Sequence, residues 1–173
     1  MWIRLRFPLL FGAFLAGFSL LGQSAWFRAS VRGPLCEVLA ASAAFALDAV
    51  GFPARANGTL VTVGGFTAVV HTDCDGVVLL GLFLAAVLAF PSGWRPSLLP
   101  ATALGIGVLV VLNWLRVVAL VLTGYFDPSL FEMTHVYAWQ GLLMLGTMIV
   151  WIVWAQRALR ESEPPPQPQR AGA

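Results

Sequence analysis

Three side chains with different chemistry lie where long apolar runs meet polar loops: the thiol of Cys74, the guanidinium of Arg116 and the imidazole of His135. The thiolate is the nucleophile in cysteine chemistry, and an adjacent guanidinium or imidazolium lowers the thiol pKa and so populates the thiolate. An arginine can also stabilise an oxyanion, and a histidine can transfer protons. If the fold brings them together, the three residues predict cysteine-dependent acyl transfer.

Asn113 and Arg116 are three positions apart and share one face of a helix, so both can face the same pocket. Asn113 would then orient a catalytic partner or donate to an oxyanion. His71, three residues before Cys74, is an alternative base to His135. These two histidines and Cys74 could also bind zinc, but their spacing matches no standard pattern of zinc ligands. We expect no bound metal.

The composition indicates an integral membrane protein. Of 173 residues, 59% are hydrophobic and 10% are charged, whereas about 25% are charged in a typical soluble domain. This length allows one compact bundle. The ten basic residues are all arginines, the net charge is only +2, and the arginines are scattered, which argues against binding to nucleic acid.

Four apolar stretches are predicted to cross the bilayer: Phe7–Trp26, Val77–Phe90, Leu98–Leu122 and Val136–Trp154. The first could also be a secretory signal, but both interpretations put the following segment outside the cytoplasm. The second is only about 21 Å long as a helix, against a hydrocarbon core of about 30 Å. This threading brings Cys74, Arg116 and His135 to one face of the membrane.

The segment before Cys74 is predicted to lie outside the bilayer core. Leu35–Val50 is apolar, but Glu37 and Asp48 share a helical face, which favours an interfacial helix over a fifth span. Thr59–Val63 and Phe66–Val70 are β-branched-rich runs separated by two glycines, which predicts a β-hairpin. The hairpin would place the polar loop that contains Cys74 at the start of the second predicted span.

The charges of the loops predict the orientation. With the N-terminus inside, six arginines fall on the cytoplasmic side: Arg4, Arg6, Arg95, Arg157, Arg160 and Arg170. Four acidic residues fall on the outer side: Asp73, Asp75, Asp127 and Glu132. The predicted active site therefore faces the extracytoplasmic side.

The predicted fold is an all-α integral membrane bundle of about four transmembrane helices, with an interfacial helix and a short extracytoplasmic β-hairpin. It divides the chain into a first span, an outer segment with the interfacial helix and the hairpin, a catalytic bundle of three spans, and a disordered, proline-rich cytoplasmic tail. Their ranges are 1–27, 28–76, 77–156 and 157–173.

Three short motifs in this order resemble those of the exosortase/archaeosortase family of membrane cysteine transpeptidases. They are Cys74-Asp75-Gly76 before a span, Asn113-Trp-Leu-Arg116 near the end of the next span, and His135 at the start of the last. The resemblance covers roughly residues 60 to 155, as a compact form of the family. Asp75 departs from the small residues common at that position, and its negative charge would raise the pKa of Cys74.

The resemblance implies a transpeptidase or protease of the prokaryotic cytoplasmic (inner) membrane. Its substrates would be secreted proteins with a C-terminal signal composed of a short motif, a transmembrane helix and a basic cluster. It would cleave them at the outer interface through a thioester intermediate. By this resemblance Cys74 is the nucleophile, Arg116 stabilises the thiolate or the oxyanion, His135 is the acid/base, and Asn113 and Gly76 support them. No cofactor is implied.

In a second hypothesis the chain is not an enzyme. Cys36 and Cys74 both fall on the oxidising side of the membrane, where they could form a disulfide that ties the interfacial helix to the bundle. The chain would then be a non-enzymatic membrane subunit. The reactivity of Cys74 distinguishes the two hypotheses.

Overall fold

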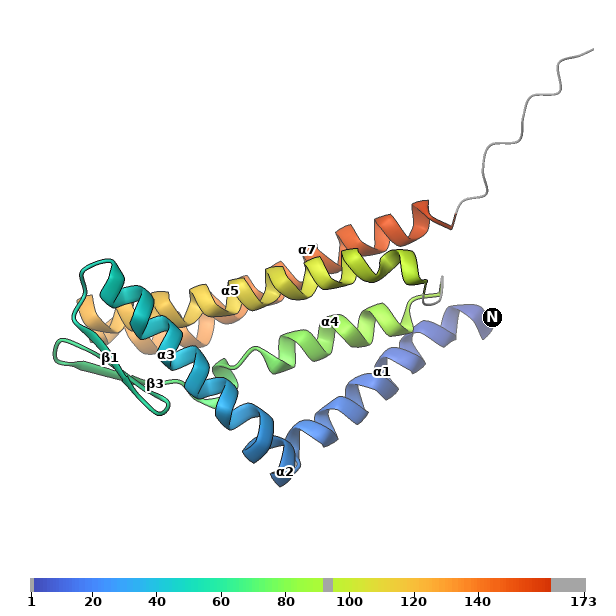
Figure 1. Cartoon of the computed structure of the whole chain (residues 1–173). Helices are drawn as coiled ribbons and strands as arrows, with labels where there is room; N and C mark the ends of the chain where they lie inside the picture. The colour runs from blue at the N-terminus through green and yellow to red at the C-terminus, as the bar shows by residue number, and fades with distance from the viewer. Residues whose placement is uncertain (1, 92–94, 163–173) are drawn as a thin grey trace, which may run out of the picture.

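The fold is a bundle of membrane helices with a small sheet at one end (Figure 1). The computed structural model describes residues 2–91 and 95–162. The bundle consists of α1 (Trp2–Gln23), α4 (Val77–Ala89), α5 (Leu99–Phe126) and α7 (Trp139–Arg160). The N-terminus and the end of α7 lie at one end of the bundle, hereafter the terminal end, and the sheet lies at the other, the sheet end.

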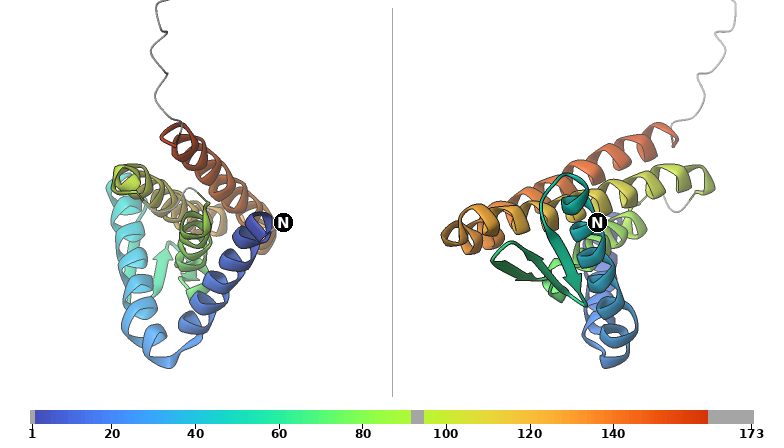
Figure 2. Two further views of the ribbon diagram at one scale, coloured as in Figure 1. Left: turned by 90° about the vertical axis from the view of Figure 1, so that its right-hand side faces the viewer. Right: turned by 60° about the vertical axis from the view of Figure 1, so that its left-hand side comes forward.

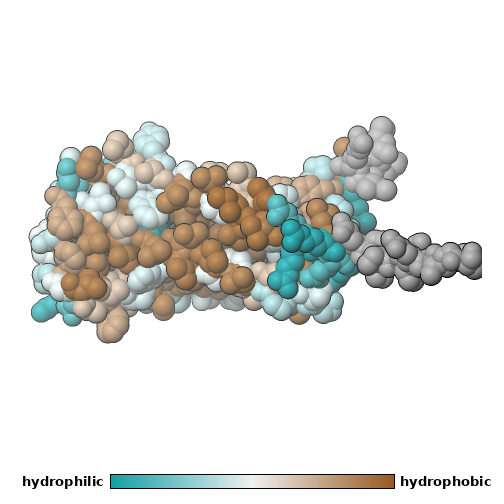
Figure 3. All heavy atoms as spheres, turned by 90° about the horizontal axis from the view of Figure 1, so that it is seen from above, coloured by the Kyte–Doolittle hydropathy of each residue, from teal (hydrophilic) through white to brown (hydrophobic). Residues whose placement is uncertain are grey.

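The side chains of the bundle explain its stability in a bilayer. In Figure 3 hydrophobic side chains gather over the middle of the molecule, and hydrophilic side chains lie towards its ends. Apolar residues that are exposed on the helices, such as Leu104 and Val153, would contact lipid. The chain is therefore an integral membrane protein, as its composition predicted.

The described helices differ in length from the predicted spans. Four helical segments are long and apolar enough to cross a membrane: Leu5–Gln23, Ala25–Ala49, Pro96–Phe126 and Pro128–Arg160. The predicted second span forms α4, which has only 13 residues and is not among these four. The segment Ala25–Ala49, which includes most of the predicted interfacial helix, is among them. Of the predicted tail, residues 157–160 continue α7, and residues 163–173 lie outside the described part of the chain.

The segment Ala25–Ala49 consists of α2 (Ala25–Phe27), the π-helical turn η1 (Arg28–Arg32) and α3 (Gly33–Ala49). In Figure 2, α1 and α3 meet at α2 and diverge; α1 packs on α4, and α3 packs on α5. Phe52, just after α3, packs edge-on against Tyr125 near the C-terminal end of α5, at a centroid distance of 5.7 Å. Hence α3 continues away from the terminal end and does not return to it (Figure 1).

The sheet has three antiparallel strands in the order β1 (Ala54–Asn57), β2 (Leu60–Val63) and β3 (Phe66–Val69). The predicted hairpin is confirmed as β2 and β3, which are joined through Gly64 at a left-handed φ of 56°. The additional strand β1 was not predicted, because its sequence lacks the β-branched residues that mark a strand. β1 packs on α3 and β3 packs on α5, which fixes the sheet against the bundle.

Short turns connect the sheet and the helices of the bundle. The 3-10 turn η2 (Thr72–Cys74) leads from β3 into α4, and η3 (Pro96–Leu98) leads into α5. At the sheet end, α6 (Pro128–Met133) and the π-helical turn η4 (Thr134–Ala138) return the chain from α5 to α7. The sheet end therefore brings η2, the C-terminal half of α5 and η4 together.

Candidate active site

The loop that carries Cys74 is held by its own backbone and by the start of α4. The Cys74 N–H donates to the carbonyl of His71 at 2.8 Å, which closes the turn η2. The Asp75 carboxylate accepts a hydrogen bond from the Val77 N–H at 2.9 Å and so satisfies one free donor of the first turn of α4. Gly76, between them, has a left-handed φ of 77°, which favours glycine. These bonds hold Cys74 in place just before the N-terminal end of α4, where it is buried.

Asn113, near the middle of α5, anchors this loop. Its side-chain Nδ2 donates to the backbone carbonyl of Cys74 at 2.8 Å. A Cβ atom on Gly76 would lie 2.9 Å from Cγ of Asn113, so only glycine permits this close approach. The two predicted supporting residues thus lie against each other, and Asn113 binds the backbone of the loop that carries Cys74.

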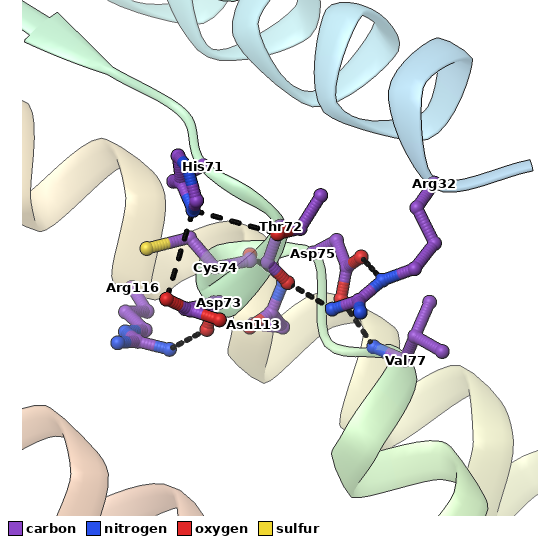
Figure 4. A network of polar contacts seen from close by, with 9 residues as sticks. All are labelled: Arg32, His71, Thr72, Asp73, Cys74, Asp75, Val77, Asn113 and Arg116. Carbon is purple, nitrogen blue, oxygen red and sulfur yellow. Dashed lines mark hydrogen bonds and ion pairs between the residues drawn. The ribbon is translucent and has the colours of Figure 1, made fainter. Parts of the chain in front are cut away.

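Arg116 lies one helical turn after Asn113 and is also buried. Its guanidinium donates to the backbone carbonyl of Asp73 at 3.4 Å, and its Nε has no hydrogen-bond partner among the described residues. Figure 4 shows the Cys74 sulfur and the Arg116 guanidinium on the same side of the loop. A buried guanidinium with spare donors beside a thiol is suited to stabilise negative charge there.

His135 makes the direct contact with the thiol. Its Nε2 lies 3.2 Å from Sγ of Cys74, within the range of a hydrogen bond to sulfur. The ring stacks on Phe131, one turn earlier, at a centroid distance of 5.8 Å and an interplanar angle of 26°. His71, the alternative base, is exposed and pairs with Asp73 at 3.6 Å. The structure thus brings Cys74 and His135 together across 61 positions of sequence.

The surroundings of Cys74 affect its acidity in opposite directions. Burial is the largest effect and raises the pKa of the Cys74 thiol above its ordinary value, because burial penalises the charged thiolate. The positive charge of Arg116 opposes this effect, whereas the carboxylates of Asp73 and Asp75 reinforce it. The net direction favours the neutral thiol over the thiolate, and Nε2 of His135 lies within hydrogen-bonding distance of this thiol.

The comparison with protein families agrees with this geometry. The model of the transmembrane exosortase family (Exosortase_EpsH) matches residues 1–154, which is most of the chain. The chain belongs to the transmembrane exosortase family. Comparison with curated proteins and with solved structures gave no match. The resemblance seen in the three motifs is confirmed.

Asp75, the departure from the family pattern, is paired with a residue that the sequence did not point to. Arg32 of η1 donates from Nε to the Asp75 carboxylate at 2.5 Å, and its terminal nitrogen donates to the carbonyl of Thr72 (Figure 4). The Asp75 side chain is only 1% exposed, so its carboxylate would otherwise be buried without a counterion. The ion pair connects α3 to the loop of Cys74.

Cys36 and Cys74 are both free thiols. Cys36 is buried in α3, in the same apolar cluster as Cys74. No bond joins them, so the disulfide on which the second hypothesis rests is not formed. Among the described residues no group of three His, Cys, Asp or Glu side chains is arranged to bind a metal ion.

Proposed function

We propose that the chain is a membrane-embedded cysteine transpeptidase or protease that cleaves the C-terminal sorting signals of secreted proteins through a thioester on Cys74. The observation that carries this proposal is the 3.2 Å contact between Sγ of Cys74 and Nε2 of His135. The Arg116 guanidinium, from α5, binds the loop that carries Cys74. Membership of the exosortase family supports the substrate class: secreted proteins with a motif, a transmembrane helix and a basic cluster at the C-terminus.

The first half-reaction forms the thioester. His135 accepts the thiol proton at Nε2 while Sγ of Cys74 attacks the carbonyl carbon of the scissile peptide. The carbonyl oxygen becomes an oxyanion, and the positive charge of the Arg116 guanidinium stabilises it. When the intermediate collapses, the C–N bond breaks and His135 gives its proton to the leaving amine.

The second half-reaction releases the product. The incoming acceptor, an amine, a hydroxyl or water, loses a proton to His135 and attacks the thioester carbonyl. The C–S bond then breaks, the new carboxyl derivative leaves, and the proton returns to Cys74. Transfer and hydrolysis differ only in the acceptor, so the same three residues serve both.

We assign the site to the outer surface of the prokaryotic cytoplasmic (inner) membrane. The described terminal end carries Arg95, Arg157 and Arg160, and cytoplasmic loops are enriched in such residues. The short helix α4 begins three residues after Cys74, so Cys74 lies close to the membrane. A nucleophile at this depth meets the substrate where its transmembrane helix leaves the bilayer.

Processing in cells tests the assignment. A secreted reporter with a three-part C-terminal signal, taken from a protein of the same cell, is co-expressed with the wild type or with variants. Cys74→Ala, Arg116→Ala and His135→Ala should abolish the change in reporter mass, whereas Cys36→Ala and His71→Ala should process it. Normal processing by Cys74→Ala would refute the proposed function.

Labelling of intact cells with a membrane-impermeant maleimide tests the thiol without any substrate. Cys74 should be labelled from outside, and its labelling rate should rise with pH because maleimide reacts with the thiolate. Burial raises the pKa of the thiol and so moves this rise to higher pH. Peptide mass spectrometry quantifies Cys36 and Cys74 separately. Protection of both cysteines until a reductant is added would favour the disulfide-linked subunit instead.

A further inference from the structure

A groove beside Cys74 runs along the edge of the sheet. It is a cavity of about 390 Å³, which lies within the usual range of ligand pockets. Its lining includes Cys74, His135 and six consecutive residues, 66–71. Successive side chains of a strand point to opposite faces of the sheet, so a cavity lined by every residue in turn must follow the backbone edge.

The backbone of β3 is free along this edge. β3 is the last strand of the sheet and pairs only with β2. The Val70 N–H donates to the Thr59 carbonyl at 2.8 Å, so Val70 faces β2. In an antiparallel pair every second residue bonds to the partner strand, so the N–H and C=O groups of Ala68 also point towards β2. Thr67 and Val69 therefore turn their N–H and C=O groups into the groove.

The rest of the groove selects what can occupy it. Its floor is the apolar face of α5 at Val117, Leu120 and Val121. Phe66 and Phe131 meet at a centroid distance of 5.4 Å. None of the described residues that line the groove is Asp, Glu, Lys or Arg. A helix would leave the free groups of β3 unsatisfied, whereas an extended apolar segment satisfies them.

We infer that an extended segment of the substrate adds to β3 as a fourth strand, with apolar side chains on α5 and the scissile peptide at Cys74. The inference rests on the proposed function. β3 runs towards Cys74 and α4, that is, towards the bilayer (Figure 1). A substrate whose transmembrane helix follows its cleavage motif runs in the same direction, so the added strand is parallel to β3.

Disulfide crosslinking tests the binding mode independently of catalysis. The enzyme carries Thr67→Cys in a background of Cys36→Ala and Cys74→Ala, and the reporter carries one cysteine at successive positions before its transmembrane helix. The crosslink yield should alternate with a period of two, because every second side chain of a strand lies on one face. The control is Ala56→Cys on β1, at the opposite edge, which should give only background. A helical period, or equal yields from both edges, would overturn the inference.

Two proline variants test its importance for processing. Val69→Pro removes an N–H that faces the groove and leaves the ladder between β2 and β3 intact, since edge strands tolerate such prolines. It should reduce reporter processing at least tenfold with maleimide labelling of Cys74 unchanged. The matched control, Ala56→Pro, removes an N–H of β1 that also faces away from β2 and should process within twofold of the wild type.

The outcomes separate the two proposals. If Cys74→Ala is inactive while Val69→Pro processes normally with its labelling of Cys74 intact, the added strand is refuted and the cysteine mechanism stands. If crosslinks alternate but Cys74→Ala still processes the reporter, the binding mode stands and the proposed catalysis is refuted.

Discussion

The buried ion pair between Arg32 and Asp75 should be the strongest single link between α3 and the Cys74 loop. Replacing Arg32 with Met keeps an unbranched apolar stem but removes the guanidinium, which leaves the Asp75 carboxylate, 1% exposed, without its counterion. Removing one partner of a buried pair costs about 3–5 kcal/mol. For a chain of this length, about 2–4 °C of melting temperature per kcal/mol gives a decrease of roughly 6–20 °C.

The reciprocal and double substitutions complete the cycle. Asp75→Asn removes the charge but keeps an oxygen for the Val77 N–H, and Arg32, 11% exposed, can turn towards solvent. Its cost should be lower, about 1.5–3 kcal/mol. The double variant contains no buried charge and should be more stable than Arg32→Met alone. Thermal unfolding in detergent measures all four proteins, with Arg28→Met, an exposed arginine of the same turn, as control.

Reactivity of Cys74 gives a second readout of the same cycle. An Asp75 carboxylate that is no longer neutralised raises the pKa of the Cys74 thiol, so Arg32→Met should slow maleimide labelling at a fixed pH. The double variant should restore the rate. Additive destabilisation in the double variant, or equal effects of Arg28→Met and Arg32→Met, would show that the ion pair does not hold the loop.

Three further substitutions probe the loop and its charges. Gly76→Ala should destabilise the protein by about 1–2 kcal/mol or more and reduce processing, because φ of Gly76 is left-handed and a Cβ atom would collide with α5. The control is Gly65→Ala, which has open space around it and should not change the melting temperature. Arg116→Ala removes the positive charge that lowers the pKa of Cys74, so the pH profile of maleimide labelling should move to higher pH. Asp73→Asn should move the profile to lower pH, and no movement in either variant would refute the electrostatic account.

The prediction that Cys74, Arg116 and His135 lie at one level agrees with the structure. A helix that crosses a bilayer has a fixed rise per residue, so the positions of Cys74, Arg116 and His135 along their apolar runs predicted one level for all three. The contact between Cys74 and His135 follows from that level and from the short connection between α5 and α7. The hairpin was predictable because Gly64-Gly65 and the flanking β-branched runs are local signals.

The features that were not predicted depend on tertiary contacts. Arg32 and Asp75 are 43 positions apart, and nothing in the spacing of either residue points to the other. Asp75 alone appeared to oppose thiolate formation, and only the fold supplies its counterion. The apolar pattern of the last span likewise did not reveal the π-helical turn η4, which carries His135 four residues after its stacking partner Phe131.

The polar groups of the site divide into those that hold the loop and those that remain free for a substrate. Asn113 and Arg116 bind the consecutive carbonyls of Cys74 and Asp73, and neither of these bonds uses the thiol. An unpaired buried donor costs about 1–3 kcal/mol, so the unpaired Nε of Arg116 lowers the stability of the folded protein. This Nε is almost fully covered, so a substrate oxyanion at the site would be stabilised by the positive charge of the guanidinium and not by a bond to Nε. If the proposed mechanism holds, Arg116 has two roles: it binds the Asp73 carbonyl, and its positive charge favours the thiolate of Cys74.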